Sequence, residues 1–98
     1  MKVQNINGTS DNECKCGSWK AHWEKYNENG DEWPMLCSEV GCIESATEGA
    51  HVQKEDEKDK NWYIIPLCKT HNGLHGKELE VVASTSFAPA NCSETCGK

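Results

Sequence analysis

Among the residues whose side chains can ligate a metal ion, four stand in two closely spaced pairs. Cys37 and Cys42 are separated by four residues, and Cys68 and His71 by two. Zinc binds four sulfur or nitrogen ligands in a tetrahedron, which two such pairs supply when the chain folds them together. The competing interpretation is that the cysteines and the histidine are buried for packing alone. Four paired ligands favour the metal, so the sequence predicts a Zn²⁺ site at Cys37, Cys42, Cys68 and His71.

A second, looser group of thiols lies near the two ends of the sequence. Cys14, Cys16 and His22 are near the start, and Cys92 and Cys96 are near the end. Because chain termini often lie close together, Cys14, Cys16, His22 and Cys96 can form a second metal site. No spacing rule selects this arrangement over a disulfide, a redox pair or free thiols, and these alternatives stay open.

The segments around the first group indicate the elements that bring its two halves together. Gly41 fits a tight turn between the first two cysteines, and the 25 residues that separate the pairs predict a hairpin with a charged tip. A short helix then places Cys68 and His71 on its first turn, where positions i and i+3 face the same way. The predicted ranges are a strand over 50–52, a turn over 54–60, a strand over 62–65 ended by Pro66, a helix over 67–75 with Gly76 as its C-cap, and a strand over 79–83.

An aromatic stripe precedes these elements. Trp19, His22, Trp23 and Tyr26 stand at i, i+3, i+4 and i+7, which predicts an amphipathic helix over about 19–28. Such rings can stack on nucleic-acid bases. A domain this small needs its tryptophans inside, however, so the stripe is interpreted as the core-facing side of the helix.

The order of knuckle, hairpin and helix with ligands at its start is similar to the treble-clef zinc fold. Within it, the stretch GAHV…WYIIPLCKTHN resembles the core of the HNH endonuclease family, over residues 37–76. In that family a histidine-bearing strand precedes a second strand, and a Pro-Leu-Cys-x-x-Cys-His-like segment opens the helix. The resemblance puts His51 on the histidine-bearing strand and His71 where the family often has a second cysteine. The whole chain also resembles a small uncharacterised bacterial family that shares the start CxCGSWxxHW.

The catalytic residues of an HNH nuclease are incompletely matched. Asn61 lies seven positions before Cys68, farther than the asparagine of the family, and Asn72 follows His71 where the family usually has histidine. His75 is four positions after His71 and can substitute for that histidine. The resemblance therefore implies the scaffold of the family with an eroded catalytic set.

His51 has three interpretations. It is a structural histidine on a strand, an additional metal ligand, or the general base that activates water in a nuclease. The last role needs partners that the sequence does not clearly supply, so no catalytic residue is assigned outside the nuclease alternative.

The size and charge of the chain limit the functions that it can have. The chain has 98 residues, of which 36% are hydrophobic and 27% charged, so a metal is expected to hold a core that burial alone supports weakly. The net charge is −6, and all ten basic residues are lysine. Without arginine or a basic stripe, general binding to nucleic acid is disfavoured. The sequence shows neither a signal peptide nor a membrane-spanning run, and clustered cysteines are then typical of metal chemistry in the reducing cytoplasm.

These observations predict one small α+β domain: a treble-clef-like zinc knuckle, a β-hairpin and a helix, with the amphipathic helix added near the N-terminus. Residues 1–13 are expected to be a mobile tail and 14–98 the zinc-binding domain, with its HNH-like core at 37–76. The predicted function is a monomeric zinc-binding module that engages a protein or nucleic-acid partner and no membrane. The alternatives are a metal-dependent HNH-like endonuclease with His51 as base, and a thiol redox sensor.

Overall fold

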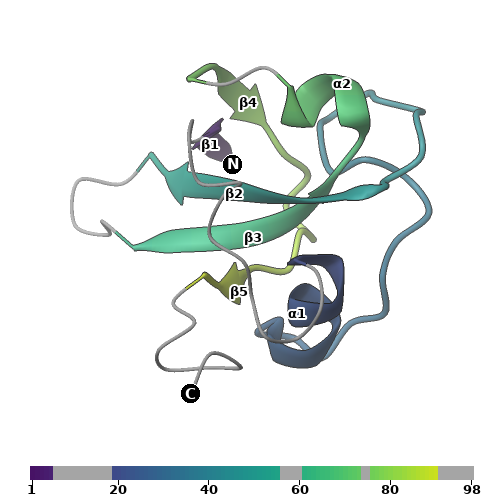
Figure 1. Ribbon diagram of the computed structural model, residues 1–98. Helices are drawn as coiled ribbons and strands as arrows, with labels where there is room; N and C mark the ends of the chain where they lie inside the picture. The colour runs from purple at the N-terminus through teal and green to yellow at the C-terminus, as the bar shows by residue number, and fades with distance from the viewer. Residues whose placement is uncertain (6–18, 56–60, 74–75, 91–98) are drawn as a thin grey trace.

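The structure is a computed structural model that describes residues 1–5, 19–55, 61–73 and 76–90 (Figure 1). These residues form an antiparallel sheet with two helices, which confirms the α+β class. The strands lie in the order β4-β1-β2-β3-β5. The elements are β1 (Lys2–Asn5), α1 (Trp19–Tyr26), β2 (Glu48–Lys54), β3 (Trp62–Leu67), α2 (Lys69–Asn72), β4 (Glu78–Glu80) and β5 (Ala88–Pro89).

The β2–β3 hairpin occupies the middle of the sheet and separates the two ligand pairs along the chain. Its register places His51 opposite Ile64. The second strand continues through Pro66 to Leu67, so the expectation that Pro66 ends it is wrong. A proline can continue a strand but cannot donate a backbone N–H to a neighbouring strand. Strand β5 pairs with β3 only at Tyr63 and Ile64, so on the β5 side of the sheet no described strand needs a hydrogen-bond donor from Pro66.

Strand β1 corrects the expectation of a mobile tail over residues 1–13. Lys2–Asn5 lies inside the sheet, between β4 and β2, and the side chain of Val3 is fully buried. Val3 pairs with Lys54 on one side and Leu79 on the other. Four residues are too few to show a strand periodicity, and both partners lie far along the sequence. The remainder of that range, 6–13, lies outside the described residues.

Alternate residues of β3 point to opposite faces of the sheet and divide the core in two. Ile65 is buried in one cluster together with Cys37 and Cys68. Ile64 is buried in the other cluster with Trp23 of α1. Figure 1 shows α1 and α2 on opposite sides of the hairpin, in agreement with these clusters. The ligand cysteines and helix α1 therefore lie on different faces of the sheet.

Helix α1 lies close to β2 at Gly49. A Cβ at this position would lie 2.7 Å from the backbone carbonyl carbon of Trp19 and 2.8 Å from the backbone nitrogen of Lys20. Only glycine allows backbones to meet at such a distance. The close approach brings the ring of Trp19 over β2, where it contacts the ring of His51 edge-on with 4.3 Å between centroids.

The helix predicted over about 19–28 ends at Tyr26, because the side chain of Asn27 binds the following turn. The Nδ2 atom of Asn27 donates to the carbonyl oxygens of Trp23 and Asp31, each at 3.0 Å. The N–H of Asp31 donates back to Oδ1 of Asn27 at 2.7 Å. An asparagine that binds its own neighbours in this way competes with continuation of the helix.

Helix α2 is shorter than the predicted range 67–75. Cys68 is its N-cap, and Gly73 ends it by donating its N–H to the carbonyl oxygens of Lys69 and Thr70 at 3.0 and 3.2 Å. Residues 74 and 75, and with them His75, lie outside the described residues. Strand β4 overlaps the predicted strand at 79–83, and β5 was not predicted, because two residues carry no periodicity. Among the helices of the described parts of the chain, none is long and apolar enough to cross a membrane.

Candidate metal centre

The four predicted first-group ligands lie together in space. The Sγ atoms of Cys37, Cys42 and Cys68 and a ring nitrogen of His71 all lie within 4.8 Å of one another. The Cys37 Sγ to His71 Nδ1 distance is 3.5 Å, the Cys42 Sγ to Cys68 Sγ distance is 4.0 Å, and the Cys68 Sγ to His71 Nδ1 distance is 3.1 Å. Tetrahedral zinc, with its bonds of about 2.3 Å to sulfur and 2.0 Å to nitrogen, would set its ligand atoms about 3.5 to 3.8 Å apart. The cluster therefore has the dimensions of a metal-binding tetrahedron.

The first pair lies on a loop whose two ends are hydrogen-bonded to each other. The N–H of Cys37 donates to the carbonyl oxygen of Glu44 at 2.9 Å, and the N–H of Cys42 donates to that of Glu39 at 3.1 Å. Gly41 adopts a φ of +80°, a left-handed conformation that side chains disfavour, and so permits the turn between the cysteines. The loop thereby directs both sulfurs to the same point.

The second pair lies at the start of α2. Cys68, as the N-cap, has extended backbone angles, and its Sγ accepts a hydrogen bond from the N–H of His71 at 3.4 Å. Burial raises the pKa of the Cys68 thiol, but hydrogen bonds with the backbone and ring of His71 and with the thiols of Cys37 and Cys42 together outweigh it and bring the pKa to about 7. The helix start thus favours a thiolate at Cys68, which is the form that binds metal.

Cys37 has the opposite tendency when no cation is present. Burial raises the pKa of its thiol to about 11, although the N–H groups of Glu39 and Cys68 partly offset this effect. A second thiolate beside Cys68 is therefore unfavourable unless a positive charge balances the two. A divalent cation supplies that charge and deprotonates thiols that it binds. The donor set fits a metal ion on chemical as well as geometric grounds.

Asn5 supports the ligand helix from a distant part of the chain. Its Nδ2 atom donates to the carbonyl oxygens of His71 and Asn72, both at 2.9 Å. Its backbone N–H and carbonyl oxygen bind Lys77 and Gly76 at 3.0 and 2.8 Å. The two side-chain bonds bring a donor from β1 to the last carbonyls of α2. No pattern in the sequence indicates this role, because Asn5 lies in the segment expected to be a tail.

The second predicted group is not brought together by the described residues. Cys14, Cys16, Cys92 and Cys96 lie outside them, and only His22 is described. His22 belongs to α1, and its ring is fully buried, with Nε2 2.5 Å from the carbonyl oxygen of Pro89. Burial lowers the pKa of His22. The ring therefore has a structural partner in β5, and the second metal site stays a prediction.

His51 lies away from the four-ligand cluster. It is 7% exposed and packs against Trp19, on the face of the sheet that α1 covers. Burial, and to a lesser degree the neighbouring His22, lower the pKa of His51 to about 4. At neutral pH the ring is an uncharged part of the core beneath α1. This environment favours the structural interpretation of His51 over the general base, which must reach solvent or substrate.

The low pKa of His51 predicts a loss of stability in mild acid. The unfolded chain binds a proton near the ordinary pKa of 6.5, whereas the folded chain binds it only near 4. Stability is therefore complete above pH 6.5 and falls as the pH drops toward 4. Between pH 7.5 and 5.5 we expect His51 to account for a decrease of roughly 1 kcal/mol in the free energy of unfolding.

Urea titrations of the wild type and His51→Gln at the two pH values measure this decrease. The same metal ligands are present in both proteins, so protonation of the thiolates cancels in the comparison. We expect the wild type to lose more stability than the variant between pH 7.5 and 5.5. Parallel losses in the two proteins would show that His51 does not titrate in this way.

Comparison of the chain with family models, with curated proteins and with solved structures finds no match in any of the three.

Proposed function

We propose that this chain is a zinc-binding module whose metal is structural and whose function is to engage another macromolecule. The observation that carries the proposal is the cluster of three thiols and one imidazole within 4.8 Å. Thiolate and imidazole ligands suit zinc better than magnesium or calcium, which prefer oxygen. A complete set of four protein ligands is typical of structural zinc, whereas catalytic zinc keeps one position for water.

The proposed centre is treble-clef-like and its scaffold HNH-like. Support comes from the order of parts around the cluster: the loop with Cys37 and Cys42, the β2–β3 hairpin, and α2 with Cys68 and His71 at its start. The cluster joins two segments, 37–42 and 68–71, which the β2–β3 hairpin separates along the chain. Metal binding to such a site is coupled to folding.

Several features favour a binding function over nuclease chemistry. His51, the base of the nuclease alternative, is buried under Trp19 on the face opposite the cluster. The chain has no arginine and a net charge of −6, so its hold on a phosphate backbone is weak. A protein partner is therefore favoured over a nucleic acid.

Nuclease assays with the purified chain test this proposal. Plasmid and single-stranded DNA are incubated at low salt with Mg²⁺, Mn²⁺ or Ni²⁺, and zinc content is measured in the wild type and His51→Ala. We expect no cleavage and an unchanged zinc content in the variant. Cleavage that His51→Ala abolishes, in a variant that is still folded by NMR, would instead support the endonuclease. Loss of zinc in that variant would make His51 a ligand.

A further inference from the structure

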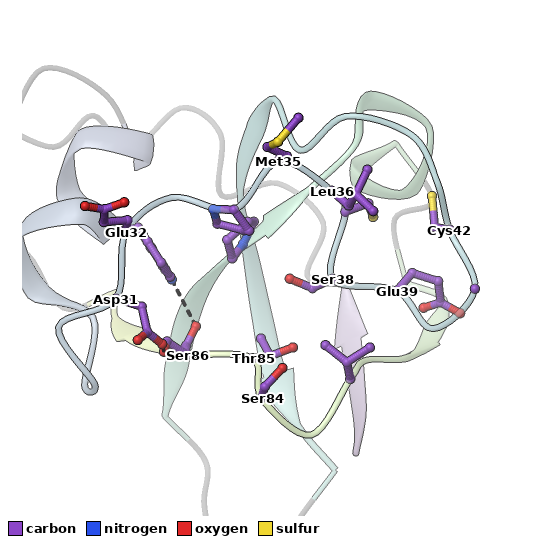
Figure 2. A pocket seen from close by; sticks show the side chains of 16 residues that line it. Asp31, Glu32, Met35, Leu36, Ser38, Glu39, Cys42, Ser84, Thr85 and Ser86 are labelled. Atoms are coloured by element: carbon purple, nitrogen blue, oxygen red, sulfur yellow. Dashed lines mark hydrogen bonds between the residues drawn. The ribbon is translucent and has the colours of Figure 1, made fainter.

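A groove runs beside the metal cluster and shares two of its ligands. Its volume is about 800 Å³, within the range of roughly 300–1,000 Å³ that is typical of binding sites. Cys37 and Cys42 belong to its wall, and Pro66 of β3 lies in its buried part. Figure 2 shows Met35 and Leu36 on one side and Ser84 and Thr85 across from them. The loop that bears the first two ligands is thus one wall of the groove.

Two buried polar atoms of groove-lining residues have no hydrogen-bond partner among the described residues. They are the Oε2 atom of Glu39 and the Oγ1 atom of Thr85. Buried polar atoms in folded proteins are almost always paired with protein groups or with ordered water, so each of these atoms is expected to have a partner other than the described residues. A carboxylate oxygen accepts hydrogen bonds, whereas a hydroxyl can also donate one. As residues that line the groove, Glu39 contributes a carboxylate that can accept from a cationic N–H, and Thr85 contributes a hydroxyl that can donate to or accept from a peptide group.

The rim of the groove is apolar and unusually exposed. Met35 is 85% exposed, Leu36 50% and Val82 41%, and all three line the groove. Exposed apolar side chains gathered at a groove are typical of a surface that another molecule covers. A small ligand within the groove would leave the outward parts of this rim in water, whereas an extended polypeptide can cover the rim and fill the groove together.

The charged residues that line the groove favour a polypeptide of opposite charge. Asp31, Glu32 and Glu39 line it, and no lysine or histidine of the described residues does. One Asp31 carboxylate oxygen already accepts a hydrogen bond from the hydroxyl of Ser86, whereas Glu39 has a buried oxygen without a partner in the described parts of the chain. A field of this sign attracts a basic side chain and repels phosphate.

We propose that this groove binds an extended segment of a partner protein in which a lysine or arginine is flanked by apolar side chains. The inference rests on the proposed function and names the partner class for it. The basic side chain pairs with Glu39, the flanking side chains cover Met35, Leu36 and Val82, and Thr85 binds the segment's backbone. Because the metal holds one wall of the groove, binding requires the zinc-loaded chain.

A screen of random octapeptides with blocked termini, against the full zinc-loaded chain, tests the proposal. We expect enrichment of peptides with lysine or arginine beside apolar residues. The best peptide is then titrated into ¹⁵N-labelled chain, and we expect amide shifts over 35–42 and 82–86. Replacing the basic residue of that peptide by glutamine should abolish the shifts.

Matched variants locate the contact. Glu39→Gln removes the charge at the groove, and we expect the peptide to bind at least about tenfold more weakly. Glu44→Gln makes the same change on the same loop at an exposed residue that does not line the groove, and affinity should be unchanged. Zinc content and amide dispersion are measured on the same samples, so failure of the zinc site is distinguished from failure of the groove.

Other outcomes overturn the inference. If the folded, zinc-loaded chain enriches no basic apolar peptide, or if both variants bind the peptide equally, the groove is not its site. Amide shifts confined to another surface would show that the chain binds the peptide, but not in this groove. Binding of a 20-base-pair DNA duplex over 35–42 and 82–86 would show that the groove binds nucleic acid and not a peptide. Concentration-dependent dimerisation that is lost in Glu39→Gln would show that the groove binds a second copy of this chain.

Discussion

Chelation of the bound metal is expected to unfold the chain. In the described parts of the chain, ten buried residues form the larger core cluster, and two of them are the proposed ligands Cys37 and Cys68, so this part of the core is built around the site. Structural zinc contributes on the order of 10 kcal/mol to the folding of small zinc domains. That amount is comparable to the whole stability of an ordinary domain, about 5 to 15 kcal/mol. We therefore expect no folded population without metal.

The measurement is a ¹H–¹⁵N correlation spectrum at neutral pH, before and after addition of a chelator. The wild-type spectrum should be dispersed, and its amide proton shifts should collapse to a narrow range after chelation. Dispersion should return when excess zinc is added under reducing conditions. A metal-free spectrum that keeps its full dispersion would contradict the account.

Cys68→Ser is expected to abolish metal binding and, with it, the fold. Cys68 is both a ligand and the N-cap of α2, and a serine is itself a good N-cap. The substitution therefore preserves capping while it removes a thiolate from the site. Removal of one ligand leaves the other thiols without the charge that balances them, and the expected loss is several kcal/mol, most of the contribution of the metal.

Cys92→Ser provides the control for this variant. It makes the same chemical change at a cysteine outside the four-ligand cluster, which is already complete for a tetrahedral ion. Zinc content by elemental analysis and thermal unfolding by circular dichroism compare the two variants. We expect Cys92→Ser to resemble the wild type. Equal losses of zinc content and thermal stability in both variants would show that the four ligands have been assigned wrongly.

The candidate site was predictable from the sequence because its signals are local. Cys37 and Cys42 flank a glycine turn, and Cys68 and His71 stand three positions apart, so each pair indicates its own geometry. The hairpin between them was predictable too, since the aromatic and β-branched residues from Trp62 onward are typical of a strand. Each of these features is indicated by residues that lie close together in the sequence.

The parts of the fold that were missed depend on long-range contacts. Strand β1 exists because Val3 fits between β2 and β4, and β5 exists because Ala88 pairs with Ile64. Neither segment is long enough to show its own periodicity. The role of Asn5 at the end of α2 depends on the same tertiary placement. The groove likewise forms between the 35–42 loop and the 82–86 segment, which only the folded chain brings together.

The proposed zinc ion has three sulfur ligands and one nitrogen ligand from this chain. Zinc K-edge X-ray absorption, on a sample that carries one zinc per chain, identifies these ligand atoms. We expect a shell of three sulfur atoms at about 2.3 Å and one nitrogen at about 2.0 Å. A shell composed only of oxygen and nitrogen, or one with four sulfurs, would contradict the assignment of Cys37, Cys42, Cys68 and His71 as the ligands.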